Sequence, residues 1–388
     1  MIIMDASPKE TPSVKETHKR VLKCLSVVAL LYLFLVSVGL MGRGFTLLGA
    51  GFAEALVRAC ANPLAGLFIG ILATSLIQSS STTTSLVVGF VAGGVIPFSA
   101  AVPILMGANI GTTVTNIIVS LTFVSRKEEF RRAFAGAVVH DFFNVFSVLV
   151  LFPLEMAFGI IEKSSLWLTG VFEDVGGVRF TSPVQAAVRP VVRGIQALLA
   201  DSLGLPDIAA GGVMVGIAIA MLIVSLIYLV RTMRELVMSS AEGLVDKYLF
   251  RNDFVAFGLG VLLTILVQSS SITTSVAVPL VAAGLLTLSR CYPFTLGANI
   301  GTTCTALLAS LATVQVVDGK AATIGVTAAF AHLLFNVFGI AVFYPLKRIP
   351  IASAVWLANL ATESKRWAII FLVGSFIVVP AVLFLLTR

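Results

Sequence analysis

The sequence predicts an all-α polytopic membrane protein built from two inverted repeats. The chain has 388 residues, of which 58% are hydrophobic and 12% charged, and its mean hydropathy is +1.04. Soluble domains carry about 25% charged residues, so most of this chain belongs in lipid. Gln-Ser-Ser-Ser occurs at 78–81 and 268–271, and Gly-Ala-Asn-Ile-Gly-Thr-Thr at 107–113 and 297–303. Both motifs recur after 190 residues, which indicates an internal duplication.

The N-terminal region predicts a cytoplasmic tail followed by a membrane span. Residues 1–20 are polar and charged, and the apolar run after them, Val21–Met41, is too long for a cleaved signal peptide. The segment Phe45–Cys60 is mixed in character, with Glu54 and Arg58 four residues apart. That spacing suits a helix lying in the membrane interface.

The first repeat, residues 21–153, contains two segments that differ from ordinary spans. In residues 63–94, two apolar arms flank Gln-Ser-Ser-Ser, and neither has the roughly 20 residues that a span needs. We expect a re-entrant helical hairpin whose polar tip is buried in protein or lines a cavity. Residues 98–124 carry Pro103 and the glycine-containing motif in their middle, and they predict a broken helix. Ala133–Phe152 completes the repeat as a span.

The same pattern returns after a less apolar connection. Residues 154–207 contain several charged, Gly and Pro residues and predict an extracytoplasmic connecting loop with one amphipathic segment. The second repeat, residues 208–346, has a hairpin at 254–284 and a broken helix at 293–316. The remaining parts are the spans Ile208–Val230 and Ala321–Pro345, and a cytoplasmic loop with a C-terminal helix at 347–388 that includes Trp367–Leu386.

Basic residues set the predicted orientation. The regions richest in Lys and Arg are residues 1–23, 126–132, 231–253 and 347–366. Placing them in the cytoplasm gives a consistent alternation, which explains the net charge of +7 without nucleic-acid binding. Three spans separate the starts of the repeats, so the second is inverted, and the two tips meet near the midplane, where inverted-repeat transporters bind substrate. We expect a multi-pass protein of the plasma (inner) membrane with a cytoplasmic N-terminus.

The motifs supply neutral ligands and almost no charge. Hydroxyl and amide side chains donate and accept hydrogen bonds, and helix N-termini that point inward add N–H groups. Such groups suit a tetrahedral oxyanion, and the oxygens suit Na⁺. Between Gln78 and Ser125 there is no charged residue, and between Phe254 and Val317 there is only Arg290. Because neither ion alone finds a partner charge, we expect an anion and Na⁺ to bind together.

Structural interpretations of these residues stay open. Ser and Thr in membrane helices often bond to carbonyls one turn earlier or join helices, and the motif glycines can serve close packing. Asp141 is the only acid well inside an apolar span, where it is functional or paired with a group such as His140. His140 and His332 are interpreted as buried helix–helix hydrogen-bond donors rather than proton carriers. The cysteines lack metal-ligand spacing and are interpreted as buried free thiols: Cys24, Cys60, Cys291 and Cys304.

These motifs resemble those of the type II sodium–phosphate cotransporter family. The similarity includes both Gln-Ser-Ser-Ser signatures, both Gly-Ala-Asn-Ile-Gly-Thr segments and Phe130–Asn144, and it covers about residues 63–154 and 254–345. The resemblance implies sodium-driven uptake of inorganic phosphate by alternating access, with no enzymatic activity. It also implies no cofactor beyond co-transported Na⁺, and a homodimer as the usual assembly.

The candidate site residues follow from the motifs and the resemblance. Including the two motif asparagines, the candidate phosphate-binding residues are Gln78, Ser79, Ser80, Ser81, Thr82, Asn109, Ser269, Ser270, Ser271 and Asn299. The candidate sodium-binding residues are Gln268, Ser269, Thr302 and Thr305, with Thr112, Thr113 and Thr115 at pseudo-symmetric positions. Electrogenic members of the family have an added Asp for a further sodium. Since Gln78–Ser125 contains no acid, we expect an electroneutral cycle of two sodium ions with divalent phosphate.

Other functions fit the sequence less well. The main alternative is a sodium-coupled symporter for another oxyanion, such as arsenate, sulfate or a carboxylate, although a dicarboxylate usually requires an Arg and none lies at the tips. An enzyme with Ser79 or Ser269 as nucleophile has both histidines in other segments and lacks a Gly-x-Ser-x-Gly elbow. A channel is distinguished from a carrier by uphill, sodium-dependent accumulation.

Overall fold

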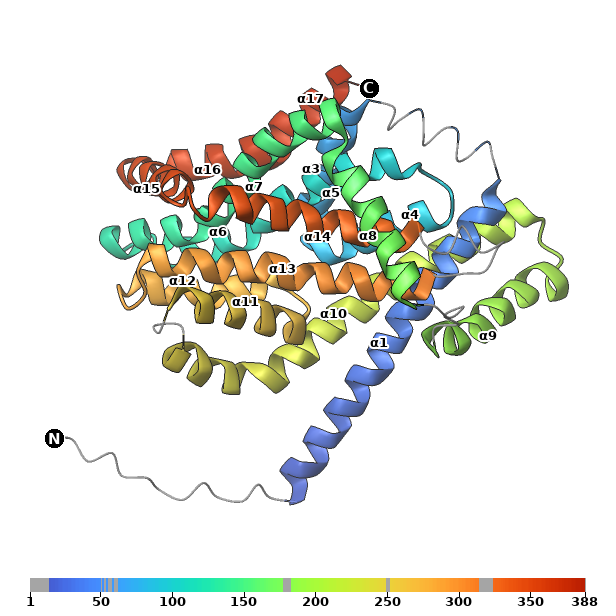
Figure 1. The fold of residues 1–388 in the computed structure, drawn as a ribbon. Helices are drawn as coiled ribbons and strands as arrows, with labels where there is room; N and C mark the ends of the chain where they lie inside the picture. The colour runs from blue at the N-terminus through green and yellow to red at the C-terminus, as the bar shows by residue number, and fades with distance from the viewer. Residues whose placement is uncertain are drawn as a thin grey trace.

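The structure is a computed structural model, and it describes residues 14–49, 51, 54, 58, 62–176, 183–248, 252–313 and 324–387. Every regular element in these ranges is helical (Figure 1). Within them, seven helices are long and apolar enough to cross a membrane, which confirms an all-α polytopic membrane protein. The seven are Val21–Leu48, Phe98–Leu121, Lys127–Phe158, Asp207–Leu236, Leu288–Ala312, Ile324–Phe343 and Lys365–Thr387.

Two long helices, α1 (Val14–Leu48) and α10 (Asp207–Tyr248), pack along each other at one side of the bundle (Figure 1). Both extend beyond the predicted spans into the charged segments beside them. Lys and Glu are good helix formers, and Lys23 Nζ of α1 lies 3.0 Å from Glu235 Oε2 of α10. Cys24 is exposed rather than buried, because its half of α1 projects from the bundle.

Part of the N-terminal segment predicted to lie in the membrane interface falls outside the described residues, and so does Cys60. The segment predicted to lie in the interface, Phe45–Cys60, begins inside α1, and only a few of its later residues are described. Arg58 Nη2 lies 3.7 Å from Glu54 Oε2, as the four-residue spacing suggests. Cys291 is buried and Cys304 half-buried, and both are free thiols.

Four short apolar helices form two pairs at the predicted hairpin positions. α3 (Pro63–Ile77) is followed by α4 (Ser80–Ala92), and α11 (Asp253–Val267) is followed by α12 (Ser270–Ala282). The arms have 15 and 13 residues in each pair. At about 1.5 Å per residue they are roughly 20–22 Å long, which is shorter than a hydrocarbon core of about 30 Å.

The sequence fixes both ends of the first arm in the same way in each pair. Asn62 Oδ1 accepts a hydrogen bond from the Leu64 N–H at 3.0 Å, with Pro63 at the first helical position. Asn252 caps α11 similarly through the Val255 N–H at 2.8 Å. Such caps satisfy N–H groups that have no partner inside the helix. Each first arm ends at a glutamine in the left-handed conformation, and the serine after it caps the second arm.

The helices that carry Gly-Ala-Asn-Ile-Gly-Thr-Thr differ between the two copies. The first is broken, as predicted: α5 (Phe98–Ile110), a 3-10 turn (Gly111–Thr113) and α6 (Val114–Leu121). The second, α13 (Leu288–Thr313), is continuous through Pro293, so the prediction of a broken helix there was wrong. A proline near a helix start removes a single hydrogen bond, which membrane helices tolerate when neighbouring helices support them.

Residues 154–207 were predicted to form a connecting loop with one amphipathic segment, and the structure has helices there. α7 (Lys127–Phe158) begins within the charged run and ends at Gly159, which is left-handed with φ 62°. α8 (Ile160–Gly176) then packs against α14 (Ile324–Phe343), where Thr169 Oγ1 and Thr327 Oγ1 lie 3.0 Å apart. Among its described residues the connection also contains α9 (Pro183–Ala197) and a π turn at Leu198–Ser202.

The loop predicted at residues 347–366 also contains a helix. α15 (Arg348–Glu363) buries Pro350, Ala354, Leu357, Ala358 and Ala361. These residues form a stripe at helical spacing, which packs against α7. The last span consists of α16 (Lys365–Val373), a π turn at Gly374–Val378 and α17 (Val379–Thr387).

The two halves of the chain interlock through their second hairpin arms. α4 packs against α13 and α14, and α12 packs against α6 and α7. The first arms pack mainly on helices of their own halves, α3 on α5 and α11 on α13, and α3 also packs on α17 near the end of the chain. The core of the molecule is therefore the region where each hairpin enters the opposite half.

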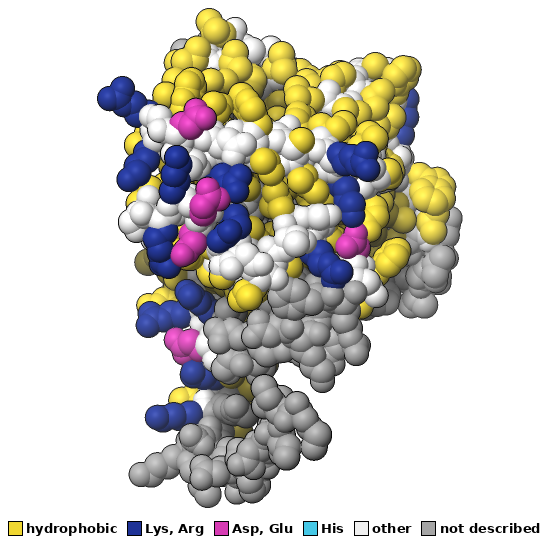
Figure 2. Space-filling model, turned by 90° about the vertical axis from the view of Figure 1, so that its left-hand side faces the viewer, with side chains coloured by type: hydrophobic (Ala, Val, Ile, Leu, Met, Phe, Trp, Pro, Cys, Tyr) yellow, Lys and Arg dark blue, Asp and Glu magenta, His cyan; other side chains and the backbone are white. Residues whose placement is uncertain are grey.

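Lys and Arg side chains gather on one end of the molecule. Figure 2 shows this end, the left-hand side of Figure 1, with only a few Asp and Glu side chains between the basic ones. α12 and α15 lie at this end, as their labels in Figure 1 show. Some of these basic side chains form ion pairs: Arg126 with Glu129 and Lys347 with Asp253, each with a shortest N–O distance of 2.8 Å.

We expect Glu155→Ala to destabilise the turn between α7 and α8. Glu155 is 5% exposed, and its carboxylate accepts hydrogen bonds from the N–H groups of Ile161 (2.6 Å) and Glu162 (3.1 Å). Removing the acceptor leaves these N–H groups without partners, which costs about 1–3 kcal/mol. Thermal unfolding of the purified protein in detergent measures this, with the exposed Glu363→Ala as control. Equal stability of the two variants would contradict the prediction.

Candidate functional site

The hairpin tips place most of the predicted serines and threonines in the interior. Five of the predicted phosphate-binding hydroxyl residues are at most 9% exposed: Ser80, Ser81, Thr82, Ser270 and Ser271. Ser79 and Ser269 are half-buried, because each caps the first turn of a second arm. Gln268 is 8% exposed, whereas Gln78 is exposed. The two tips are therefore similar in backbone conformation but differ in the solvent exposure of their glutamine side chains.

The two tips meet the opposite half of the chain. Ser81 Oγ lies 3.5 Å from the carbonyl oxygen of Gln268, which is the tip of the second hairpin. Ser271 Oγ donates to the carbonyl oxygen of Thr112 at 3.1 Å. Asn116 Nδ2 of α6 donates to Thr274 Oγ1 of α12 at 2.7 Å. The motifs, far apart in sequence, thus form one polar region inside the bundle.

Some of the hydroxyls serve helix structure, as the structural interpretation allowed. Ser79 Oγ accepts hydrogen bonds from the Thr82 N–H (3.2 Å) and Thr82 Oγ1 (2.9 Å). Thr83 and Thr273 donate to carbonyl oxygens four residues earlier, at 3.2 and 3.1 Å. These bonds hold the first turn of each second arm, whose N-terminus lies at the tip.

The predicted sodium-binding residues are brought together in part. Thr305 Oγ1 donates to Gln268 Oε1 at 2.8 Å, and both side chains are buried. The matching pair in the first half, Thr115 Oγ1 and Gln78 Oε1, is longer at 3.4 Å and exposed. Two further threonine hydroxyls, of Thr302 and Thr112, bond to carbonyl oxygens of their own helices at 3.0 and 3.1 Å. The side chain of Thr113 lies outside the described residues.

The motif asparagines belong to a buried network with two histidines. His332 Nε2 lies 3.3 Å from Asn109 Oδ1, and His140 Nε2 contacts Asn299 Oδ1. An amide oxygen accepts only, so each histidine donates across helices, in agreement with the sequence interpretation. Further bonds link Asn299 Nδ2 to Asn144 Oδ1 at 3.0 Å and Asn336 Nδ2 to Asn109 Oδ1 at 3.2 Å.

This network changes the role of the two asparagines. Their amides already bond to α7 and α14, so they reach an anion at the tips only by giving up these bonds. The prediction from the sequence assigned no role in the site to Asn144 and Asn336. It missed Asn116 and Thr274, and the signal for Asn116 was its polar side chain in a segment without charges.

The site is neutral, as the sequence predicts, apart from one nearby acid. Asp141 is fully buried in α7 beside His140. Among the described residues, no group of three or more His, Cys, Asp and Glu side chains is placed to hold a metal ion. The chemistry on offer consists of hydroxyl donors, amide and carbonyl oxygens, and helix N-termini, which bind a tetrahedral oxyanion or an alkali cation without reacting with it.

Fold and site together define a class of polytopic membrane protein in which two helical hairpins with polar tips meet inside the bundle. Residues 33–164 and 221–345 match the model of the family described as Na⁺/Pi-cotransporter. The chain belongs to this family, which is one of transporters rather than enzymes.

Curated relatives support this assignment. The chain is 32% identical to sodium-dependent phosphate transport protein 2A of Rattus norvegicus, over 97% of this chain and 69% of the relative. It is 30% identical to sodium-dependent phosphate transport protein 2B of Homo sapiens, over 93% of this chain and 65% of the relative. No solved structure matches the chain.

Proposed function

We propose that this protein is a secondary transporter that couples sodium influx to the uptake of inorganic phosphate. The observation that carries the proposal is the meeting of two buried, hydroxyl-lined tips without a permanent charge, in a chain of the Na⁺/Pi-cotransporter family. An oxyanion there gains hydrogen bonds and helix N-termini but no cation from the protein. Co-bound Na⁺ supplies that cation, so each ion stabilises the other in a medium of low dielectric constant.

We assign phosphate to the space between Ser79–Thr82 and Ser269–Ser271, where both second arms begin. The helices α4 and α12 both begin at this space, and the positive end of a helix dipole favours an anion. The exposed Gln78 joins the site once the first tip closes. Asn109 and Asn299 hold α5 and α13 against α14 and α7 and orient the tips.

We assign one sodium ion to oxygens around Gln268 and Thr305, with Ser269 and Thr302 beside them. The bond between Gln268 Oε1 and Thr305 Oγ1 places two neutral oxygens 2.8 Å apart in a buried position. The matching region of Gln78 and Thr115, with Thr112 and Thr113, is the second candidate.

We further propose that the halves are inverted repeats that work by alternating access. The pairs Gln268–Thr305 and Gln78–Thr115 are related by the same offset as the motifs, which supports a two-fold relation between the halves. The basic end in Figure 2 is then the cytoplasmic side of a plasma (inner) membrane, with the N-terminus on that side. The active assembly is a homodimer, in line with the resemblance of the sequence.

Sodium-dependent uptake into proteoliposomes tests the function. We expect labelled phosphate to accumulate under an inward sodium gradient and not under a potassium gradient, and Ser269→Ala to lose this accumulation. Arsenate is expected to compete because of its tetrahedral shape. Uptake that is indifferent to sodium would refute coupling, and sulfate transport without phosphate transport would shift the assignment to another oxyanion.

Voltage clamp tests the electroneutral cycle. Because no acid lies between Gln78 and Ser125, we propose that two sodium ions move with one divalent phosphate. An inward current evoked by phosphate would refute this stoichiometry while leaving sodium coupling intact.

We expect Thr305→Val to weaken sodium binding more than Thr115→Val. The first variant removes a buried donor 2.8 Å from Gln268 Oε1, and the second removes an exposed contact of 3.4 Å. The valine removes one of the oxygens proposed to coordinate sodium, and a loss of about 1–2 kcal/mol corresponds to roughly tenfold in the sodium concentration for half-maximal uptake. Thr305→Ser keeps the hydroxyl and serves as control. Equal sodium dependence of the two valine variants would contradict the assignment.

A further inference from the structure

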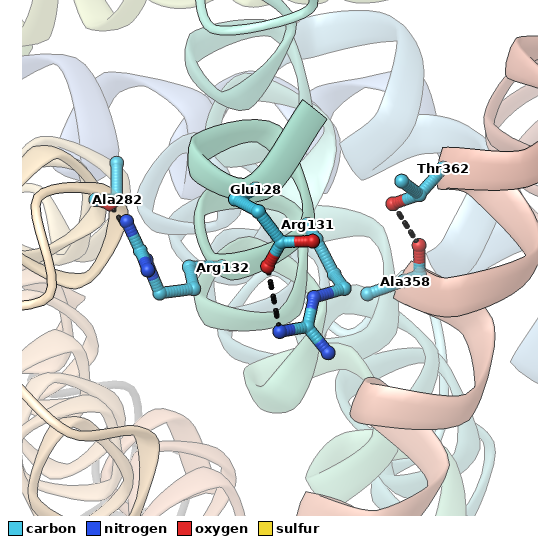
Figure 3. A network of polar contacts seen from close by, with 6 residues as sticks. All are labelled: Glu128, Arg131, Arg132, Ala282, Ala358 and Thr362. Carbon is cyan, nitrogen blue, oxygen red and sulfur yellow. Dashed lines mark hydrogen bonds and ion pairs between the residues drawn. The ribbon is translucent and has the colours of Figure 1, made fainter. Parts of the chain in front are cut away.

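A pocket of about 250 Å³ lies at the basic end of the molecule, away from the hairpin tips. Its lining comes from the first turns of α7, the end of α12 with the turn that follows, the start of α13, and α15. Figure 3 shows this region, with Arg131 and Arg132 on α7, Ala282 on α12, and Ala358 on α15. The pocket therefore joins the second hairpin to α7 of the first repeat and to α15, which follows the second repeat.

Two arginines supply the charge of this pocket. Arg132 Nε donates to the Ala282 carbonyl oxygen at 2.8 Å, which fixes its guanidinium at the end of α12 (Figure 3). Arg131 Nη2 lies 2.8 Å from Glu128 Oε2, and the Glu128 side chain is 63% exposed. The Nε of Arg131 is buried and makes no hydrogen bond to the described residues. Because Glu128 is not among the lining residues, the two arginines give the pocket an excess of positive charge.

The rest of the pocket is mostly apolar. Thr287 is the remaining lining residue with a polar side chain, and Val281, Leu286, Leu288 and Val355 form much of the wall. A small, fully hydrated anion gains nothing from such a wall. An amphiphile with an anionic head gains both from the guanidinium groups and from the apolar surface.

We propose that this pocket binds an anionic phospholipid. The phosphate oxygens accept hydrogen bonds from Arg131 and Arg132, and the glycerol and the upper acyl chain lie against the apolar wall. Guanidinium groups recognise phosphate through paired, charge-assisted hydrogen bonds. Basic pockets between membrane helices on the cytoplasmic side suit such headgroups, and the gathering of Lys and Arg in Figure 2 places this pocket on that kind of surface.

Binding at this position ties the second hairpin to its surroundings. The lipid contacts the end of α12 through Val281 and also α7 and α15. If the hairpin moves during transport, an occupied pocket favours the arrangement in which these three elements are together. This last step rests on the proposed function, but the binding itself does not.

Thermal unfolding of the full-length protein in detergent tests the binding, in a sodium-free choline buffer where coupled transport plays no part. The probes are phosphatidylglycerol, phosphatidylcholine with the same acyl chains, glycerol 3-phosphate and inorganic phosphate. We expect phosphatidylglycerol alone to raise the unfolding temperature. Its apparent affinity should fall about tenfold in Arg131→Gln, which loses charge-assisted bonds. It should remain within about twofold in Arg126→Gln, because Arg126 is exposed and lies outside the pocket.

A second variant separates binding from folding defects. Val355→Trp fills the pocket without changing charge, and Val355 is 38% exposed, so a larger side chain is accommodated. We expect it to lose the effect of phosphatidylglycerol as Arg131→Gln does. An unchanged response in both pocket variants would overturn the proposal. Equal stabilisation by phosphatidylcholine, or by inorganic phosphate or glycerol 3-phosphate, would also overturn it, because the site would then not select an anionic lipid.

Discussion

Replacing Gln268 with glycine is expected to abolish sodium-dependent phosphate uptake while leaving the stability of the protein within about 1 kcal/mol of wild type. Gln268 has φ 57°, a left-handed conformation that residues with a side chain adopt at a cost. Glycine adopts it freely, which offsets the lost hydrogen bonds of the Gln268 side chain to Thr305 and Ile265. A residue kept in a costly conformation at a buried tip indicates a functional role for its side chain.

Two variants sharpen this test. Gln268→Asn keeps an amide and tolerates the left-handed conformation, so we expect partial uptake. Gln78 has the same left-handed backbone conformation as Gln268, with φ 59°, but its side chain is exposed, so Gln78→Gly removes an exposed side chain. It should reduce uptake less than Gln268→Gly does. The measurements are labelled-phosphate uptake and thermal unfolding on the same preparation. Normal uptake by a folded Gln268→Gly would show that this amide is not part of the site.

The sequence predicted the hairpins because two short apolar arms flank each Gln-Ser-Ser-Ser, and in the structure nearby residues set the ends of these arms. Asn62 and Asn252 cap the first arms, and the Gln-Ser pair ends one arm and starts the next. These are short-range effects, so a single sequence reveals them. The left-handed glutamines were not predicted, because glycine or asparagine is the usual residue at such positions.

Tertiary packing decided what the sequence did not reveal. α13 is continuous through Pro293, and packing against α11 supports it there. α15 was predicted to be a loop because its ends are charged, although its stripe of small apolar residues follows helical spacing. The buried network that includes Asn109 also joins His140 to Asn299, and these two residues are more than 150 positions apart in the sequence. Motif spacing alone does not show that such side chains meet.

The motif glycines allow close packing of helices, which the sequence offered as the structural interpretation of these residues. A Cβ at Gly107 would lie 2.0 Å from the Leu67 carbonyl oxygen of α3, and a Cβ at Gly297 would lie 2.0 Å from the Phe257 carbonyl oxygen of α11. On the facing helix, a Cβ at Gly260 would lie 2.1 Å from the Phe294 carbonyl oxygen. Backbone thus packs directly on backbone in both halves, which only small residues allow in membrane helices.

We therefore expect Gly297→Ala to prevent stable folding, at a cost of about 3 kcal/mol or more. The atoms that block the new Cβ belong to the backbone of α11, so no side-chain rotation relieves the contact. The matched control is Gly258→Ala in α11, where nothing lies within 4 Å of a Cβ. It should leave stability unchanged or raise it by up to about 1 kcal/mol, since alanine favours helix.

Size-exclusion chromatography and thermal unfolding in detergent distinguish these outcomes. A folded Gly297→Ala with the stability of Gly258→Ala would mean that α11 and α13 lie further apart than the structure places them. The expected loss has a consequence for transport, because Gln268 follows α11 and Thr305 belongs to α13. If these helices are locked by backbone contact, Gln268 and Thr305, whose side chains are proposed to bind sodium, move as one body through the cycle.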